Sequence, residues 1–300
     1  MVNNLTISQG MLILDEAFSK TRKIMQGYPG VKFTAEEYQR YYECVYLLCV
    51  QRTSSENARI LYERYQNGLE ECINSLILPA LEDKNGAPLL TELMLKWSGY
   101  QVFARWLSRF FEYLDRFYVP RVEGFRLLDL AVKCFDDLVN ARLNTKIVTA
   151  AISLINQDRS GEQVDRSLLK NVVEYFLAAR SVGGTCYHNF RMALLADAAA
   201  YYSQIASNGL LYDSCDDYMR KAEWCLTQEN EKTSHYLDQY TQASLLEVLP
   251  KLAEKKQAEH YGQSTDYQDM LSKCEGLNLG DRASRSGVED CLAALVLDRS

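Results

Sequence analysis

Residues 105–119 read RWLSRFFEYLDRFYV, a pattern that indicates an α-helix with a broad apolar face. At 100° per residue, large apolar side chains share one face, and Arg105, Arg109, Glu112 and Arg116 lie opposite. The apolar positions are Trp106, Leu107, Phe110, Phe111, Leu114, Phe117 and Tyr118. Tyr113 lies at the boundary, beside Arg109 and Arg116. Such a face exceeds the ~100° that a surface helix needs, so the helix is either enclosed in its domain or keeps apolar surface for a partner.

The rest of the sequence repeats the helical pattern. Five prolines in 300 residues leave long stretches without a helix breaker, and strand signals are scarce. Apolar spacing predicts helices over 7–25, 36–51, 57–77, 89–97, 102–119, 125–143, 145–156, 164–179, 190–207, 216–237, 242–259 and 265–273. The connections are short, which favours antiparallel neighbours. We expect an all-α protein of about a dozen helices, stacked in repeats of roughly five helices each.

Two helix starts carry capping signals. Thr34 is followed three residues later by Glu37, the spacing of a capping box. The run from Asp213 to Asp216 offers several capping residues before the helix predicted there.

Composition argues against several classes of protein. The net charge is −7 and no Lys/Arg run occurs, so we expect no nucleic-acid partner. No uncharged run approaches the ~18 apolar residues of a membrane span, and residues 1–10 lack the pattern of a secretory signal. The nine cysteines form no CxxC motif, which is typical of reduced thiols in a protein core. We therefore expect a protein of the cytoplasm and nucleus, without a membrane partner.

Motifs for chemistry are missing. The sequence has no GxGxxG, GxxxxGK[ST], HExxH or GxSxG motif. Three scattered histidines without paired cysteines predict no metal site, and nothing indicates a cofactor. Cys186 and His188, after a Gly183-Gly184 turn, could form a nucleophilic pair, and this leaves an all-α enzyme as a minor alternative.

The predicted helix over 36–51 carries a row of tyrosines. Tyr41, Val45 and Leu48 share one stripe that faces the core, while the row itself follows at spacing four along the adjacent edge. The row consists of Tyr38, Tyr42 and Tyr46. It either packs on another helix of the same domain or forms an interface, since tyrosine and arginine are enriched at binding hot spots.

Several runs resemble, in order, the N-terminal region of cullins, in particular plant cullins of the SCF class. They are EEYQRYYECVYLLC (36–49), RWLSRFFEYLDRFYV (105–119), CFDDLV (134–139), GEQVDRSLLKNVV (161–173) and SCDDYMRKAE (214–223). The resemblance covers about residues 5–260 and thins through 261–300. It implies an elongated stack of about two and a half five-helix cullin repeats. The first would span 1–150 and the second 151–260, with a partial, divergent third repeat or tail over 261–300.

The resemblance also implies a function. Cullins are non-catalytic scaffolds of RING-type ubiquitin ligases, and their N-terminal tip binds a Skp-type adaptor that carries an F-box substrate receptor. The adaptor sits on the second and fifth helices. The matching positions here are Tyr38, Tyr42, Tyr46, Tyr113 and Arg116, and helix geometry adds Arg109.

The later half of cullins, which recruits the RING subunit, has no counterpart in these 300 residues, so we expect no RING partner. The resemblance then implies that this form could compete for adaptor without transferring ubiquitin. An unrelated helical-repeat subunit for complex assembly or tethering is the remaining alternative.

Overall fold

The computed structural model describes residues 5–51, 53–122, 124–212 and 215–247. Within these ranges every regular element is a helix, which confirms the all-α fold class. The helix expected over 265–273, the tail over 261–300 and the capping residues 213–214 lie outside the described residues.

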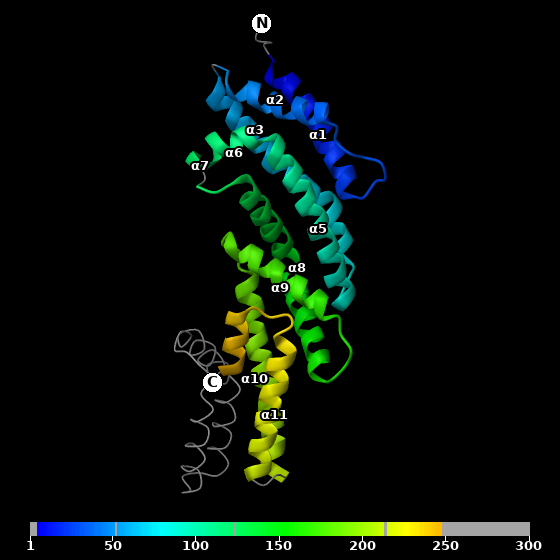
Figure 1. Cartoon of the computed structure of the whole chain (residues 1–300), viewed down its shortest axis with the longest axis vertical. Helices are drawn as coiled ribbons and strands as arrows, with labels where there is room; N and C mark the ends of the chain where they lie inside the picture. The colour runs from blue at the N-terminus through cyan, green and yellow to red at the C-terminus, as the bar shows by residue number, and fades with distance from the viewer. Residues whose placement is uncertain (1–4, 52, 123, 213–214, 248–300) are drawn as a thin grey trace. The chain divides into compact units, whose positions relative to one another are not determined.

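Figure 1 shows the helices in chain order. They are α1 (Ile7–Met25), α2 (Ala35–Cys49), α3 (Ser54–Cys72), a π-helical turn η1 (Ile73–Ile77), α4 (Leu78–Glu82), α5 (Gly86–Phe110), α6 (Glu112–Phe117), α7 (Val119–Val122), α8 (Leu127–Arg159), α9 (Arg166–Ser181), α10 (Cys186–Tyr212) and α11 (Cys215–Thr233). Residues 239–247 are also helical.

The chain divides into two compact units. The first comprises residues 1–147 and 176–186, and the second comprises 148–175 and 187–300. The predicted repeat boundary at residues 150 and 151 stays a prediction, because a division by contacts does not identify cullin repeats.

Reciprocal capping fixes the starts of the first two helices. The Thr34 hydroxyl accepts a hydrogen bond from the Glu37 amide, and the Glu37 carboxylate accepts one from the Thr34 amide at 2.9 Å. The predicted capping box is therefore confirmed. Thr6 and Gln9 form the same arrangement at α1. Both boxes satisfy amide donors that a helix start otherwise leaves without partners.

The helix predicted over residues 102–119 is interrupted, so the prediction of one continuous helix there is wrong. The chain is helical to Phe110, turns at Phe111 and resumes as α6. Packing explains the turn: the Phe111 ring contacts Phe18 at 6.1 Å and Tyr65 at 5.3 Å between ring centroids, in a fully buried position. The break changes which side chains beyond it face the core.

Other helix boundaries also differ from prediction. The helices expected over 89–97 and 102–119 are joined, because α5 runs without interruption from Gly86 to Phe110. The helix expected over 57–77 ends at Cys72 and continues as the π-helical turn η1, just before Pro79. Proline lacks the amide that would continue the hydrogen-bond ladder, which favours an irregular turn ahead of it. The helices expected over 125–143 and 145–156 are one helix, α8, because no glycine or proline separates them.

The core of the first unit is aromatic. Phe18 of α1 lies between Phe103 and Phe111, with ring centroids at 6.3 and 6.1 Å. Helix α3 approaches the Phe18 ring through Gly68, where an added Cβ would lie 2.0 Å from a ring carbon. Buried Tyr65 donates its hydroxyl hydrogen to the carbonyl oxygen of Leu127 at 3.1 Å, so its polar end is satisfied.

Candidate protein-binding surface

Helix α2 packs against α5 and α6 and brings four aromatic side chains into a continuous surface row. The rings of Tyr42 and Tyr46 stack at 6.5 Å, and Tyr46 meets Tyr113 edge to face at 5.1 Å. Tyr113 in turn contacts Phe117 at 4.7 Å. We call Tyr42, Tyr46, Tyr113 and Phe117 the aromatic face.

The aromatic face is only partly covered by the protein. Tyr46 is 40% exposed and Phe117 is 49% exposed, while Tyr42 and Tyr113 are half-buried. Single exposed apolar residues are ordinary, but a contiguous row of rings is typical of an interaction surface. The Tyr row packs on neighbouring helices and keeps a side toward solvent, and its use as an interface stays a prediction.

The other three predicted site residues make contacts outside this face. Tyr38 packs against Phe110 at 5.9 Å between ring centroids. Exposed Arg109 places its guanidinium 5.5 Å from the Trp106 ring. Exposed Arg116 forms an ion pair with Glu112, one turn earlier in α6. The structure therefore brings Tyr42, Tyr46 and Tyr113 into contact with one another and leaves Tyr38, Arg109 and Arg116 at separate contacts.

Phe117 is the residue that the sequence pattern misplaced. As one straight helix, residues 105–119 put Phe117 on the apolar face, but after the turn at Phe111 it lies outside the core, against Tyr113. Only the tertiary packing of Phe111 determines this turn, so helical periodicity could not have identified Phe117.

Asp115 holds α6 in place and was also missed. Its side chain is buried, and the carboxylate accepts hydrogen bonds from the Leu127 amide at 2.7 Å and from the Arg126 guanidinium at 2.6 Å. This carboxylate ties α6 to the start of α8, and so positions Tyr113 and Phe117. The charge of Asp115 on a mostly apolar stretch is the signal that could have indicated a buried anchoring role.

Helix α2 is anchored from its other side. The Lys20 ammonium of α1 donates to the Glu37 carboxylate at 2.6 Å. This hydrogen bond, together with the Thr34 amide, lowers the pKa of Glu37 below its ordinary value. The Tyr41 ring, buried below the Tyr row, packs on Phe110 at 5.2 Å. Helix α2 therefore presents its tyrosines from a backbone held on both sides.

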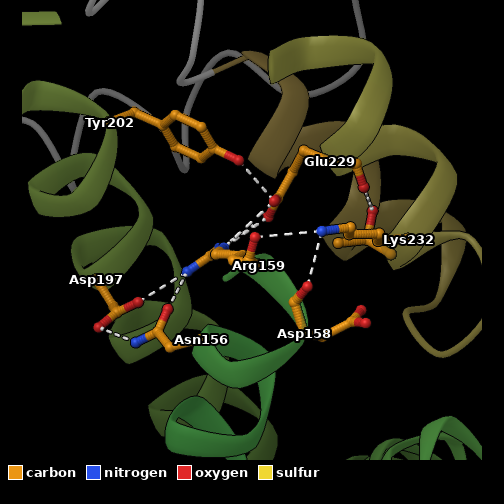
Figure 2. Close-up of polar contacts among 8 residues, drawn as sticks. Asn156, Asp158, Arg159, Asp197, Tyr202, Glu229 and Lys232 are labelled. Carbon is orange, nitrogen blue, oxygen red and sulfur yellow. Dashed lines mark hydrogen bonds and ion pairs between the residues drawn. The ribbon is translucent and has the colours of Figure 1, made fainter. Parts of the chain in front are cut away.

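The second unit contains a buried cluster of charged side chains, shown in Figure 2. The Arg159 guanidinium, 2% exposed, pairs with Glu229 and with Asp197, each at 2.8 Å. Glu229, 1% exposed, also accepts a hydrogen bond from the Tyr202 hydroxyl at 2.7 Å. Lys232 donates to the carbonyl oxygens of Asp158 and Arg159 at the end of α8. These groups satisfy one another and join α8, α10 and α11, so they brace this unit and do not offer a ligand site.

The alternative of a Cys/His nucleophile is not supported by the geometry. Cys186 is completely buried at the start of α10, whereas His188 is exposed. Among the described residues, no three His, Cys, Asp or Glu side chains gather as metal ligands. In the same part of the chain, no helix has the length and apolarity needed to cross a bilayer.

Comparison with known proteins agrees with the helical architecture. The family model "Cullin alpha solenoid domain" matches residues 16–281. Rice Cullin-1 is 41% identical over 244 residues, which cover 81% of this chain and 33% of that protein. The chain thus matches about a third of the length of that relative.

Two Arabidopsis thaliana relatives are covered more fully. Putative cullin-like protein 2 is 34% identical over 80% of this chain and 65% of that protein. Cullin-like protein 3 is 30% identical over 78% of this chain and 91% of that protein. Because the cullin family model matches most of its residues and these cullin-like proteins are similar to it, the chain belongs to the cullin family.

Proposed function

We propose that this chain is a non-catalytic scaffold of a cullin-RING (SCF-type) ubiquitin ligase, and that it binds a Skp-type adaptor through the aromatic face. The observation that carries the proposal is the row of partly exposed rings on α2 and α6. Membership of the cullin family replaces the alternative of an unrelated helical-repeat subunit.

The aromatic face has the composition of a binding hot spot. Tyrosine buries a large area with few rotatable bonds, and arginine adds directional hydrogen-bond donors. Both are therefore over-represented among the side chains whose truncation to alanine weakens an interface most. Ring contacts already fix Tyr42, Tyr46 and Tyr113, which lowers the entropy lost on binding.

The mechanism is positioning and involves no bond chemistry in this chain. An adaptor docked on α2 and α6 would carry its F-box receptor, and the helices would hold that receptor at a fixed place. A polypeptide of these 300 residues alone would occupy adaptor without recruiting a RING subunit, and so would compete with complete ligases. Overexpression should then lengthen the half-life of an F-box substrate in a cycloheximide chase, and an unchanged half-life would count against competition.

Titration calorimetry with a purified Skp-type adaptor tests the binding proposal. We expect Tyr42→Ala/Tyr46→Ala to weaken the Kd by at least roughly 30-fold, since one hot-spot tyrosine contributes about 2 kcal/mol. Tyr28→Ala is the matched control, because Tyr28 is exposed but lies in the loop after α1, outside the aromatic face. Circular dichroism should be unchanged in both variants. No binding by the folded wild-type chain, or equal loss in the control, would refute the proposal.

A further inference from the structure

A second surface lies on the other side of α2. It is a groove of about 830 Å³ between α1 and α2. Glu36, Glu43 and Leu47 line it from α2, and their helical positions are rotated by roughly 120° from the Tyr row. The groove is therefore separate from the aromatic face, and a ligand there does not require a bound adaptor.

Part of the groove lining is apolar. Leu5, Leu12 and Ile13 contribute from the α1 side, and Leu47 contributes from α2. Leu12 is 68% exposed, while the other three are half-buried. A single exposed leucine is ordinary, but one exposed and three half-buried aliphatic side chains in the same concavity are typical of a groove that receives an apolar helix face.

The rim of the groove is acidic. Glu16 and Arg40 neutralise each other in an ion pair of 2.9 Å across the two helices. Glu36 and Glu43 also line the groove, and the ion pairs found among the described residues give neither a cationic partner. Backbone and Thr34 hydrogen bonds lower the pKa of Glu36, so it is ionised at neutral pH. An occupant with basic side chains at this rim would be electrostatically favoured.

We propose that the α1–α2 groove is a docking site for a basic amphipathic helix of a partner protein. Its apolar side chains would cover Leu5, Leu12 and Leu47, and lysine or arginine would face Glu36 and Glu43. The lining of α1 spans residues 9–16, with Leu5 just before the helix, and at 1.5 Å per residue this segment is about 15–17 Å long. The occupant therefore has about three helical turns and apolar residues at spacing three and four.

Three stapled, fluorescein-labelled 16-residue helices provide the probe. They share leucines at positions 3, 7, 10 and 14 and carry lysine, glutamine or glutamate beside them. Fluorescence anisotropy should give the lysine peptide at least a tenfold lower Kd than the glutamate peptide, with the difference shrinking in high salt. Equal affinity of the three peptides for the groove would overturn the proposal.

Substitutions locate the site. Leu12→Gln should weaken the lysine peptide at least tenfold, whereas Leu95→Gln, on an equally exposed leucine of α5, should not. Glu36→Lys/Glu43→Lys should reverse the preference toward the glutamate peptide. An unchanged preference, or equal losses for Leu12→Gln and Leu95→Gln, would overturn the proposal.

Two other occupants have distinct outcomes. If the chain sediments as a dimer and Leu12→Gln dissociates that dimer, the groove binds a second copy of the chain. If the chain binds phosphatidylcholine vesicles and none of the peptides, the groove binds lipid. Either result overturns the proposal. Adaptor binding should be unchanged in Leu12→Gln, so failure of the groove and failure of the aromatic face are distinguishable.

Discussion

Replacing Arg159 by methionine should strongly destabilise the second unit. The substitution keeps much of the aliphatic stem but removes a guanidinium that is 2% exposed and bonded to Glu229, Asp197 and Asn156. The Glu229 carboxylate, 1% exposed, then retains only the Tyr202 hydroxyl among its side-chain partners shown in Figure 2.

The expected loss is large because the charge that remains cannot reach water. Removing one member of a buried ion pair costs about 3–5 kcal/mol, since the other charge stays desolvated. Asp197 adds little, because it is 30% exposed and keeps the Asn156 amide at 3.0 Å. Domains have stabilities of roughly 5–15 kcal/mol, so this single change removes a substantial fraction of the total.

Hydrogen exchange read by mass spectrometry is the suitable assay. A chain of two compact units need not unfold in one step, and a single spectroscopic curve would mix them. The slowest amides of α10 and α11 should exchange about 10²–10⁴-fold faster in Arg159→Met. Amides of α1 and α3, in the first unit, should be much less affected.

Two further variants test whether the buried charges brace the unit. Arg159→Met/Glu229→Leu removes both buried charges and should recover most of the lost protection, since apolar replacement of a buried pair is often neutral. Arg220→Met breaks an exposed pair with Asp217 and should cost less than about 1 kcal/mol. A loss below about 1 kcal/mol for Arg159→Met, or a double variant no more stable than the single, would show that this network does not brace the unit.

Three other predictions concern local features. Thr34→Ala should cost about 0.5–2 kcal/mol through loss of the α2 cap, whereas Asn85→Ala should cost less, because Asn85 precedes α5 without a side-chain cap bond; urea unfolding compares them. Gly68→Ala should cost at least about 1–3 kcal/mol, because the new methyl group would overlap the Phe18 ring; a neutral effect on the thermal midpoint would contradict that close approach. Burial raises the pKa of the Cys49 thiol to about 12, so at pH 8 its thiolate is roughly 10⁻⁴ of the population and reaction with Ellman's reagent should be slow until unfolding. In the unfolded chain the thiol has a pKa of about 8.5, so burial of the neutral thiol contributes to the free energy of unfolding below that pH. This contribution is lost as the pH rises toward 12. A free energy of unfolding that does not fall above pH 9 would contradict this.

Much of the helical order was predictable because it is local. Helix α1 spans the predicted residues 7–25, and the α2 cap follows from Thr34 and Glu37 alone. The error at Phe111 has a different cause, because distant residues decide the backbone there. The turn at Phe111 depends on packing with Phe18 and Tyr65, which are separated from it by long stretches of sequence.

The sequence likewise predicted part of the aromatic face and missed the rest. Spacing on one helix was enough to separate the Tyr row from the core stripe of Tyr41, Val45 and Leu48, all of which are buried. It was not enough to show that Tyr46 meets Tyr113, because that contact joins two helices. Nor could it reveal Phe117, whose exposure depends on the preceding turn.

The two surfaces of α2 follow from one physical constraint. A helix with a single buried stripe has two flanks that face solvent. Both flanks can bind ligands if the packing of the buried stripe holds the helix firmly on the core. Here Val45 and Leu48 are fully buried, and Lys20 clamps the first turn through Glu37. Close-packed interiors resist small displacements, so a ligand on one flank gains little by moving the helix. Binding on the two flanks should therefore be nearly additive in free energy, and coupling between them would require α2 itself to shift against its core.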